Sequence, residues 1–411
     1  MTITRDDTLA LDAADPLAFA RARFTIPEGV TYLDGNSLGA LPRRTATRVS
    51  DTITREWGEG LIRSWNSPAE GGAGWIDQPA KVGGKIARLI GGRADEVIVT
   101  DSTSINVFKL AAAALRMRPG RKVIVAEADN FPTDLYMLQG LAQLGGAELR
   151  VVPSDGILGA LGDDVALLML IHTHYRSGRV HDMAALTAAA HAAGALACWD
   201  LSHSAGAVEV DLGAAQADMA LGCGYKFLNG GPGAPAYAYV AARHHGQFEQ
   251  PLSGWMGHAA PFAFEGDYRA GPGVRRLLSG TPPVIGMAAL GAGVATFDGV
   301  DMAAAAAKSR ALGDLFITLV EQRCPEFGIA CPRDGRGAQV SLSHASAYAI
   351  MQALIGRGVI GDFRAPDILR FGFPALYVRN IDVWQAVSVL AAVMQSGEWK
   401  DAQHQKRRAV T

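Results

Sequence analysis

One aspartate and one lysine in the middle of the chain have the residue types that a pyridine cofactor needs. Asp200 ends an apolar run, and Lys226 follows between an aromatic residue and a glycine-rich loop, in WDLSHSAGAVEVDLGAAQADMALGCGYKFLNGGPGAP at 199–235. A carboxylate can keep a pyridine nitrogen protonated, and a lysine can hold pyridoxal phosphate as a Schiff base. A plain alternative remains: a buried strand that ends in a polar turn, followed by a loop with a solvated lysine.

Other residues match further demands of such a cofactor. Ser102 and Thr103 stand just before a helical pattern, where backbone N–H groups and hydroxyls bind phosphate, although such residues are also ordinary helix caps. Phe131 could stack on a pyridine ring or serve as a hydrophobic staple of the next helix. A substrate carboxylate favours an arginine, but spacing alone does not choose among the arginines. No GxxxxGK[ST] occurs, and no GxGxxG follows a strand, which disfavours nucleotides.

The histidines and cysteines give little support for a metal. His172 and His174 form an H-x-H pair, but no third ligand accompanies them at a known spacing. The four cysteines lack CxxC spacing, so neither a zinc site nor a disulfide framework is indicated. His203 could contact a cofactor or form a hydrogen bond within its turn. We therefore expect no metal.

The elements that must position these residues alternate between short β-branched runs and helical patterns. We expect strands at 97–100, 122–126, 149–152, 165–171, 195–199, 219–221 and 236–240, with helices at 104–116, 131–144 and 182–193. This alternation predicts an α/β fold with a mostly parallel, seven-stranded sheet flanked by helices. Ligands of such sheets bind beyond the carboxyl ends of the strands, where DSTS, NFPTD, HTHYRSG and DLSH stand.

The ends of the chain predict further elements around this sheet. We expect one leading helix over 1–30, a strand and tight turn at 31–42, a helix at 43–62 and a loop at 64–79 that carries Trp65 and Trp75. Beyond a Gly/Pro/aromatic segment at 251–283, we expect one long helix at about 284–320. A smaller α+β unit follows, with strands at 338–342, 359–363 and 368–373, helices at 347–356 and 382–396, and a solvated tail.

Length and charge limit the class of protein. The 411 residues suggest about two domains, and a net charge of −2 gives no sign of a nucleic-acid partner. The N-terminus lacks an apolar signal region, and the apolar runs are shorter than the ~18 residues that span a bilayer. We expect a cytoplasmic protein without a membrane partner.

A series of motifs in order along the chain resembles the kynureninase family, and most closely its bacterial branch. The motifs are YLDGNSLG (32–39), DSTS (101–104), NFPTDLY (130–136), DLSHSAGAV (200–208), GCGYKFLNGGPGAP (222–235), PLSGWMGH (251–258), LLSGTPP (277–283) and ILRFGFPALY (368–377). The resemblance implies a fold-type-I pyridoxal phosphate enzyme. Its domains would be an N-terminal segment at 1–60 that packs with the small domain, a large cofactor-binding domain at 61–290 and a small α+β domain at 291–411.

The resemblance also implies a role for each matching residue. Lys226 would form the Schiff base, Asp200 would bind the ring nitrogen, and Arg370 would bind the substrate carboxylate. The remaining cofactor contacts would come from Ser102, Thr103, Phe131, Pro132, Thr133, Asp134, Thr173, His203 and Tyr225, with Trp255 and Thr281 reaching the phosphate across a dimer interface. Asn36 and Trp65 would contact the substrate, and Tyr225 would donate a proton.

The implied reaction is hydrolysis of L-kynurenine to anthranilate and L-alanine, with 3-hydroxykynurenine as a possible second substrate, in tryptophan catabolism and the pathway towards NAD. A cysteine desulfurase or a class V aminotransferase is the alternative on the same fold. Cys324 and Cys331 lack the signature of a mobile reactive loop, which counts against a desulfurase. An inactive protein that keeps the fold is the alternative from another class.

Overall fold

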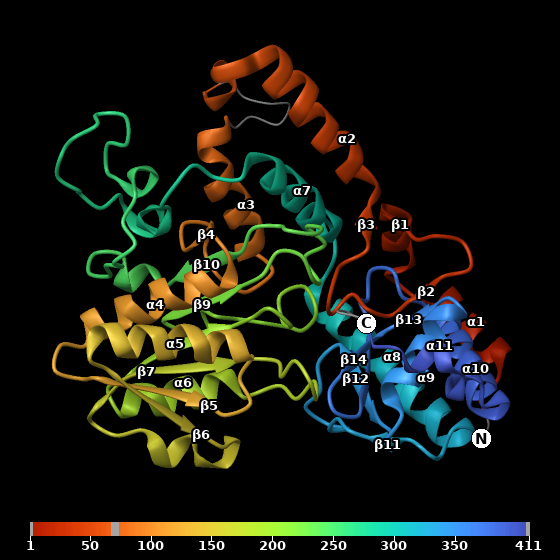
Figure 1. Cartoon of the computed structure of the whole chain (residues 1–411). Helices are drawn as coiled ribbons and strands as arrows, with labels where there is room; N and C mark the ends of the chain where they lie inside the picture. The colour runs from red at the N-terminus through yellow and green to blue at the C-terminus, as the bar shows by residue number, and fades with distance from the viewer. Residues whose placement is uncertain (1–2, 67–73, 408–411) are drawn as a thin grey trace.

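In the computed structural model, residues 3–66 and 74–407 are described, and they form a large α/β part and a smaller α+β part (Figure 1). The large part is built on a seven-stranded sheet in the order β4-β10-β9-β8-β7-β5-β6. Its strands are β4 (Val97–Val99), β5 (Val123–Glu127), β6 (Glu148–Val152), β7 (Val165–Ile171), β8 (Leu196–Asp200), β9 (Met219–Gly222) and β10 (Tyr237–Val240). Within the described sheet, β10 alone runs opposite to the other strands. The mostly parallel seven-stranded sheet expected from the sequence is confirmed.

The two faces of this sheet bury alternate residues under different helices. Side chains such as Ile124 and Leu167 face a cluster shared with α4 (Thr103–Met117) and α5 (Pro132–Gly145). Val125 and Leu168 face the opposite cluster, which takes in α3 (Gln78–Ala87), α6 (Met183–Ala192) and α7 (Val284–Val294). Because both faces are covered, the central strands read as continuous apolar runs rather than alternating ones. This explains why the sequence shows them so clearly.

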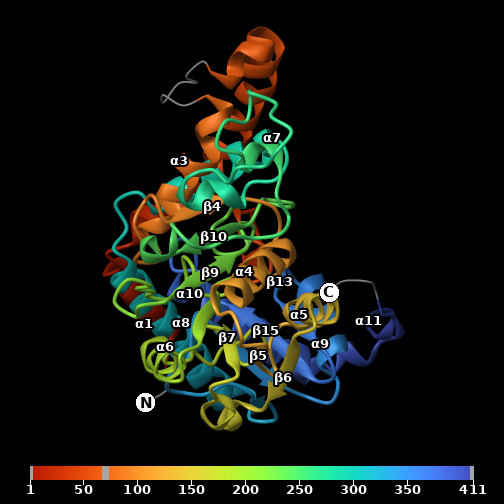
Figure 2. The same ribbon diagram turned by 90° about the vertical axis from the view of Figure 1, so that its left-hand side faces the viewer.

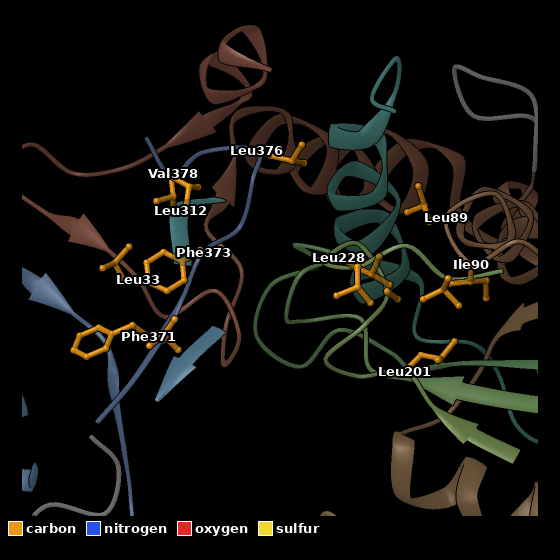
Figure 3. Packing of buried hydrophobic residues seen from close by; sticks show 14 of the residues in the cluster. Leu33, Leu89, Ile90, Leu201, Leu228, Leu312, Phe371, Phe373, Leu376 and Val378 are labelled. Atoms are coloured by element: carbon orange, nitrogen blue, oxygen red, sulfur yellow. The ribbon is translucent and has the colours of Figure 1, made fainter. Parts of the chain in front are cut away.

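The smaller part packs helices on a four-stranded antiparallel sheet in the order β11-β12-β15-β14. The strands are β11 (Gly328–Ile329), β12 (Gln339–Ser343), β14 (Asp362–Arg364) and β15 (Ile368–Gly372); the helices are α8 (Met302–Arg323), α9 (Ala347–Gly356), α10 (Asn380–Ser396) and α11 (Ala402–Gln405). One buried cluster joins both parts: Phe371 and Leu312 belong to it together with Leu201 and Leu228 (Figure 3). The core therefore continues across the boundary between the parts.

The N-terminal segment bridges the two parts. Its strand β2 (Thr31–Tyr32) pairs in parallel with β13 (Val359–Ile360), and α1 (Arg5–Ala13) packs on α10. Further along, α2 (Arg43–Asp51) continues into the π-helical segment η2 (Thr52–Gly60), and both contact α7 of the large part. In both views the end of this helix projects from the body of the molecule (Figure 2).

The prediction of one helix across residues 1–30 is wrong. The segment contains α1, a 3-10 turn at Ala18–Arg23 and β1 (Phe24–Thr25), which pairs with β3 (Leu41–Pro42). Pro16 explains the break, because proline has no N–H for the helix and restricts the residue before it. The Asp15 carboxylate then accepts from the N–H of Leu17, 2.9 Å away, where the chain turns.

The prediction of one helix at 284–320 is also wrong, since α7 ends at Val294 and α8 begins at Met302. Between them the chain turns at Gly299, whose φ of +73° favours glycine, and Asp301 caps α8 by accepting from the N–H of Ala303. The two helices bend by 85°. Among the described residues, no single helix is long and apolar enough to cross a membrane. Only when this bent pair is taken together do its length and apolar composition match those of a membrane span.

Candidate active site

A pocket lies at the carboxyl ends of the parallel strands and brings together residues from the predicted strand-end motifs. Its lining comprises Thr103, Ser104, Phe131, Thr133, Ile171, Thr173, Tyr175, Asp200, Ser202, His203, Tyr225 and Lys226. These residues end or follow β4, β5, β7, β8 and β9, so the carboxyl ends of five strands meet at one place. This is where an open parallel sheet binds its ligands.

The N-terminus of α4 forms one wall of the pocket. Ser102 is the N-cap of this helix, and its Oγ accepts from the N–H of Ile105 at 3.5 Å. Thr103 and Ser104, in the first turn, line the pocket itself. The N–H groups of a first turn have no partner within the helix and attract anions. Capping and phosphate binding are therefore compatible here, with Ser102 as the cap and the next two residues facing the pocket.

Two carboxyl groups lie close together at the pocket: Asp200 lines it, and Asp134 lies behind the lining. Asp200 is buried, and its Oδ1 accepts from the N–H of Ser202 at 2.7 Å. Asp134 is fully buried, with Asp200 as its neighbouring carboxyl group. Burial raises the pKa of both groups, and for Asp134 the neighbouring Asp200 raises it further. A buried acidic pair of this kind fits a ligand that brings a positive charge, as a protonated pyridine nitrogen does.

Lys226 points into the pocket beside a histidine. Its Nζ lies 2.9 Å from Nε2 of His203 and 5.7 Å from the ring centre of Phe131. Burial, with Lys226 as the next cause, holds the pKa of His203 well below its usual value, so the imidazole is neutral and Nε2 accepts from the ammonium. The amine is thus held in place without a carboxylate beside it. An amine so placed, an aromatic face and a helix N-terminus are the parts that pyridoxal phosphate requires.

Tyr225 completes this wall, and the N-terminal segment supports it from behind. Burial raises the pKa of Tyr225, which keeps its phenol protonated at neutral pH. Its carbonyl accepts from the N–H of Gly39 at 2.8 Å. A Cβ on Gly39 would stand 2.4 Å from the carbonyl oxygen of Lys226, so this position leaves no room for a side chain. The glycine of the predicted turn at 31–42 therefore sets the position of the lysine loop.

Arg370 lies on β15 beside the pocket but does not line it. Its guanidinium donates hydrogen bonds from Nε and Nη2 to the two carboxylate oxygens of Asp362, with Nε 2.8 Å from Oδ1. It also donates to Ser37 Oγ at 2.8 Å and to the carbonyl of Tyr175, whose side chain lines the pocket. With 1% of its side chain exposed, Arg370 connects the small part, the N-terminal turn and the loop after β7.

Several predicted contacts lie outside the pocket of this chain. The amide of Asn36 is buried without a described hydrogen-bond partner, and Trp65 packs edge-on to Trp75 with ring centres 5.8 Å apart. Trp255 is 41% exposed and packs against Phe262. Thr281 is exposed, and neither Pro132, which opens α5, nor Ser102 lines the pocket.

The sequence interpretation missed four lining residues: Ser104, Ile171, Tyr175 and Ser202. Each belongs to or adjoins a motif at the end of a strand, and this position is the feature of the sequence that could have identified them. The H-x-H pair has structural partners: His172 Nδ1 lies 3.0 Å from Ser204 Oγ, and His174 Nδ1 lies 2.8 Å from Ser177 Oγ. In the described part of the chain, no group of three or more His, Cys, Asp or Glu side chains could hold a metal.

Comparisons with known proteins identify the family that the chain resembles. Residues 305–390 match the family model described as Kynureninase C-terminal domain. Curated proteins named Kynureninase from Burkholderia mallei (strain SAVP1) and Pseudomonas fluorescens are each 51% identical to this chain, over 99% of it and 100% of their own length.

Solved structures share the fold at much lower identity. The cysteine desulfurase CsdA from Escherichia coli has a TM-score of 0.77 at 19% identity and covers 92% of this chain and 98% of its own. A mutant of C-DES with glycine covalently linked to its PLP cofactor also has a TM-score of 0.77, at 16% identity, over 90% of this chain and 98% of its own. These neighbours are fold-type-I pyridoxal phosphate enzymes, and the fold class expected from the sequence is thereby confirmed.

Proposed function

The chain belongs to the kynureninase family, and on this premise we propose the role that each of its residues has in the cleavage of L-kynurenine to anthranilate and L-alanine. The enzyme uses pyridoxal phosphate and hydrolyses a carbon–carbon bond next to a ketone. The observation that carries the proposal is the meeting of Lys226, Asp200 and the α4 N-terminus in one strand-end pocket, in a chain 51% identical over its length to proteins named Kynureninase.

We propose that the cofactor is held by residues on all sides of this pocket. Lys226 Nζ would bind it covalently, and Asp200, with Asp134 beside it, would face the ring nitrogen. The ring would lie against Phe131, near Thr133, Thr173 and His203, while Thr103 and Tyr225 would bind the phosphate beneath the cap formed by Ser102; Pro132 would fix the start of α5. When bound, pyridoxal phosphate supplies an electron sink for negative charge on the substrate.

Two side chains are proposed to move protons. Lys226 Nζ takes the proton from the substrate α-carbon, and the neutral His203 keeps that amine oriented through its Nε2. Tyr225 donates a proton to the β-carbon that becomes the methyl group of alanine. The position of Tyr225 in the pocket lining, next to Lys226, supports this role.

Arg370 is proposed to bind the substrate carboxylate, with Asn36 and Trp65 contributing to the rest of the substrate site. Its link to the carbonyl of Tyr175 supports this role, since that loop lines the pocket. An arginine fork suits a carboxylate because it can donate two parallel hydrogen bonds. In this structure the Arg370 guanidinium already donates to Asp362, so the substrate carboxylate would have to share the guanidinium with Asp362 or displace it.

We propose that the protein works as a homodimer with shared sites. Apolar side chains exposed on η2 and the following turn, Trp57 at 58% and Ile62 at 77%, support this, as do Phe262 at 54% and Phe264 at 78% beside Trp255. Apolar patches of this kind on a protein surface mark interaction sites. Trp255 and Thr281 would reach the phosphate of the partner's cofactor. We further propose cytoplasmic action in tryptophan catabolism, and the domain division at 60 and 290.

The desulfurase alternative rests only on the fold. The solved desulfurase neighbour is 19% identical, against 51% for the proteins named Kynureninase. A desulfurase also needs an accessible thiolate, whereas burial raises the pKa of Cys324 to about 12 and raises that of Cys331. Neither cysteine is suited to attack a substrate sulfur.

The test is incubation of the holoenzyme with L-kynurenine, monitored by the fluorescence of anthranilate and by the release of alanine. Equal yields of both products support the proposal, and formation of a keto acid alone would overturn it. A parallel series with 3-hydroxykynurenine compares kcat/KM for the two substrates.

A further inference from the structure

Lys109 is a lysine that lies wholly inside the protein. It sits in the second turn of α4, and 0% of its side chain is exposed. Lysine is almost never fully buried unless it is paired. Its position is unusual for a second reason, since the same helix carries the N-terminus proposed above to bind the phosphate.

The ammonium of Lys109 has a partner for each of its three protons. Nζ lies 2.6 Å from Asp101 Oδ2, 2.6 Å from the carbonyl of Leu277 and 2.7 Å from Ser279 Oγ. An ammonium group has three donors and no acceptor, so this set uses it completely. The contacts join α4 to the turn before it and to a segment about 170 residues further along the chain.

Asp101 connects the buried lysine to the pocket. It stands directly before the Ser102 cap and two residues before Thr103, which lines the pocket. Its φ of +48° lies in the left-handed region, which is uncommon for a residue other than glycine. Its carboxylate, 26% exposed, also accepts from Thr100 Oγ1 at 2.7 Å.

A carboxylate without a cation beside it at this place would weaken the binding of an anion at the start of α4. It would repel a phosphate dianion by direct Coulomb interaction, and it would offset the partial positive charge of the helix N-terminus. The Lys109 ammonium counters this negative charge, because it lies 2.6 Å from the carboxylate and is itself fully buried, so that water screens the pair less than a surface pair.

The far end of the network reaches the segment that carries Trp255 and Thr281. Ser279 Oγ donates to the carbonyl of Leu252 at 2.8 Å, and the N–H of Met256 donates to the carbonyl of Ser279. Gly254 lies so close to Ser279 that a Cβ would stand 2.3 Å from its carbonyl oxygen. One lysine thus fixes the phosphate-binding turn and the neighbouring segment together.

We propose that Lys109 is a positioning residue for the cofactor phosphate: it neutralises Asp101 and holds the turn before α4, so that the helix N-terminus is free to bind a dianion. The role rests on the proposed phosphate site. It differs from a general structural role because it predicts a selective loss of affinity for the phosphate group, rather than an equal loss for every ligand of the pocket.

The test measures binding of two amines to the full-length chain after its cofactor is removed. Pyridoxamine 5′-phosphate and pyridoxamine differ only by the phosphate and form no Schiff base with lysine, so the ratio of their dissociation constants reports the phosphate preference. We expect Lys109→Met to lower this preference about tenfold or more, because Asp101 then acts unopposed on a doubly charged group. The double variant Lys109→Met/Asp101→Asn should recover most of it.

A matched control is another lysine–aspartate pair. Lys308 lies 2.6 Å from Asp15, with side chains 13% and 7% exposed, on α8 away from the pocket. Lys308→Met should leave the phosphate preference unchanged. Equal weakening of both amines by Lys109→Met, or no recovery in the double variant, would overturn the proposal.

A second variant keeps the proposal testable if Lys109→Met does not fold. Asp101→Asn alone keeps Lys109 charged and retains an oxygen that can accept from it, so the phosphate preference should hold or rise; a fall would overturn the role. A native chain that binds neither amine would instead overturn the proposed cofactor site, and the role of Lys109 with it.

Discussion

The ammonium of Lys226 lies 2.9 Å from Nε2 of His203, a histidine that burial keeps neutral. A carboxylate in that place would hold the lysine as a permanent ion pair. A neutral acceptor orients the amine while leaving it able to lose its proton, which a lysine must do before it can act as a nucleophile or base. The negative charge proposed to face the cofactor comes instead from Asp200, which lines the same pocket.

The first prediction concerns Lys226. Lys226→Ala should remove the visible absorbance of the bound cofactor and reduce turnover by several orders of magnitude, because both the covalent link and the proposed base are lost. Absorption spectra and steady-state rates measure the two effects. Lys122→Ala, which changes an exposed lysine next to β5, should alter neither. Turnover that survives in Lys226→Ala would remove this residue from the mechanism.

The second prediction concerns Arg370. Arg370→Lys should raise KM far more than it lowers kcat, at a cost of about 2–5 kcal/mol in substrate binding, because lysine cannot replace a bidentate fork. Arg370→Ala should also lower the melting temperature, since it takes away the main partner of the buried Asp362.

The control for this prediction is Arg364, which also contacts Asp362, at 2.7 Å, but is 38% exposed. Arg364→Lys should change KM little. An equal rise in KM for the two lysine variants would contradict the special role of Arg370, and an unchanged KM in Arg370→Lys would exclude it as the carboxylate ligand.

The third prediction concerns acid stability. Burial tends to raise the pKa of Glu127, but hydrogen bonds from His181 and Arg179 outweigh it and lower the pKa from 4.5 to about 2. A carboxyl whose pKa is lower in the folded protein stabilises it fully above the unfolded value, and this contribution is lost as pH falls towards the folded value. The advantage of the native protein over Glu127→Gln should therefore shrink between pH 4.5 and 2.

The size of this loss should be up to about 3 kcal/mol, from the free-energy equivalent of the pKa difference. Denaturant titrations of both proteins at several pH values measure it. Glu148→Gln, at an exposed pair with Arg150, is the control and should show a much smaller dependence. A constant difference between native protein and Glu127→Gln across this range would contradict the assigned pKa.

The meeting of Asp200 and Lys226 in one pocket was predictable from the sequence, because the chemistry proposed for them is demanding. A carboxylate at a strand end and a lysine one strand later leave few candidates in 411 residues, and Asp200 and Lys226 do line one pocket. The strands were equally accessible, since a sheet covered on both faces leaves uninterrupted apolar runs. Local composition is enough to locate a strand when both of its faces are buried.

The links between distant segments were not predictable. Asp362 stands opposite Arg370 because β14 and β15 pair in that register, and no spacing rule gives such a register from the sequence. Lys109 is a similar case: in a helical pattern it reads as a solvated lysine, and only the position of residues 277–279 over α4 makes it a buried one. Tertiary contacts override local pattern at such positions.

The last prediction concerns the proposed sharing of sites between two subunits. If Trp255 serves the partner's site, Trp255→Ala and Lys226→Ala damage different halves of each site. Mixed dimers then contain one site with both changes and one site with neither. Random exchange of two inactive variants should therefore restore activity to about a quarter of the native level, as expected for an isologous dimer. The measurement is turnover after the purified variants are mixed and allowed to exchange, with each variant alone as control. If both residues instead belonged to one subunit's site, every site in the mixture would carry one change, and mixing would restore nothing.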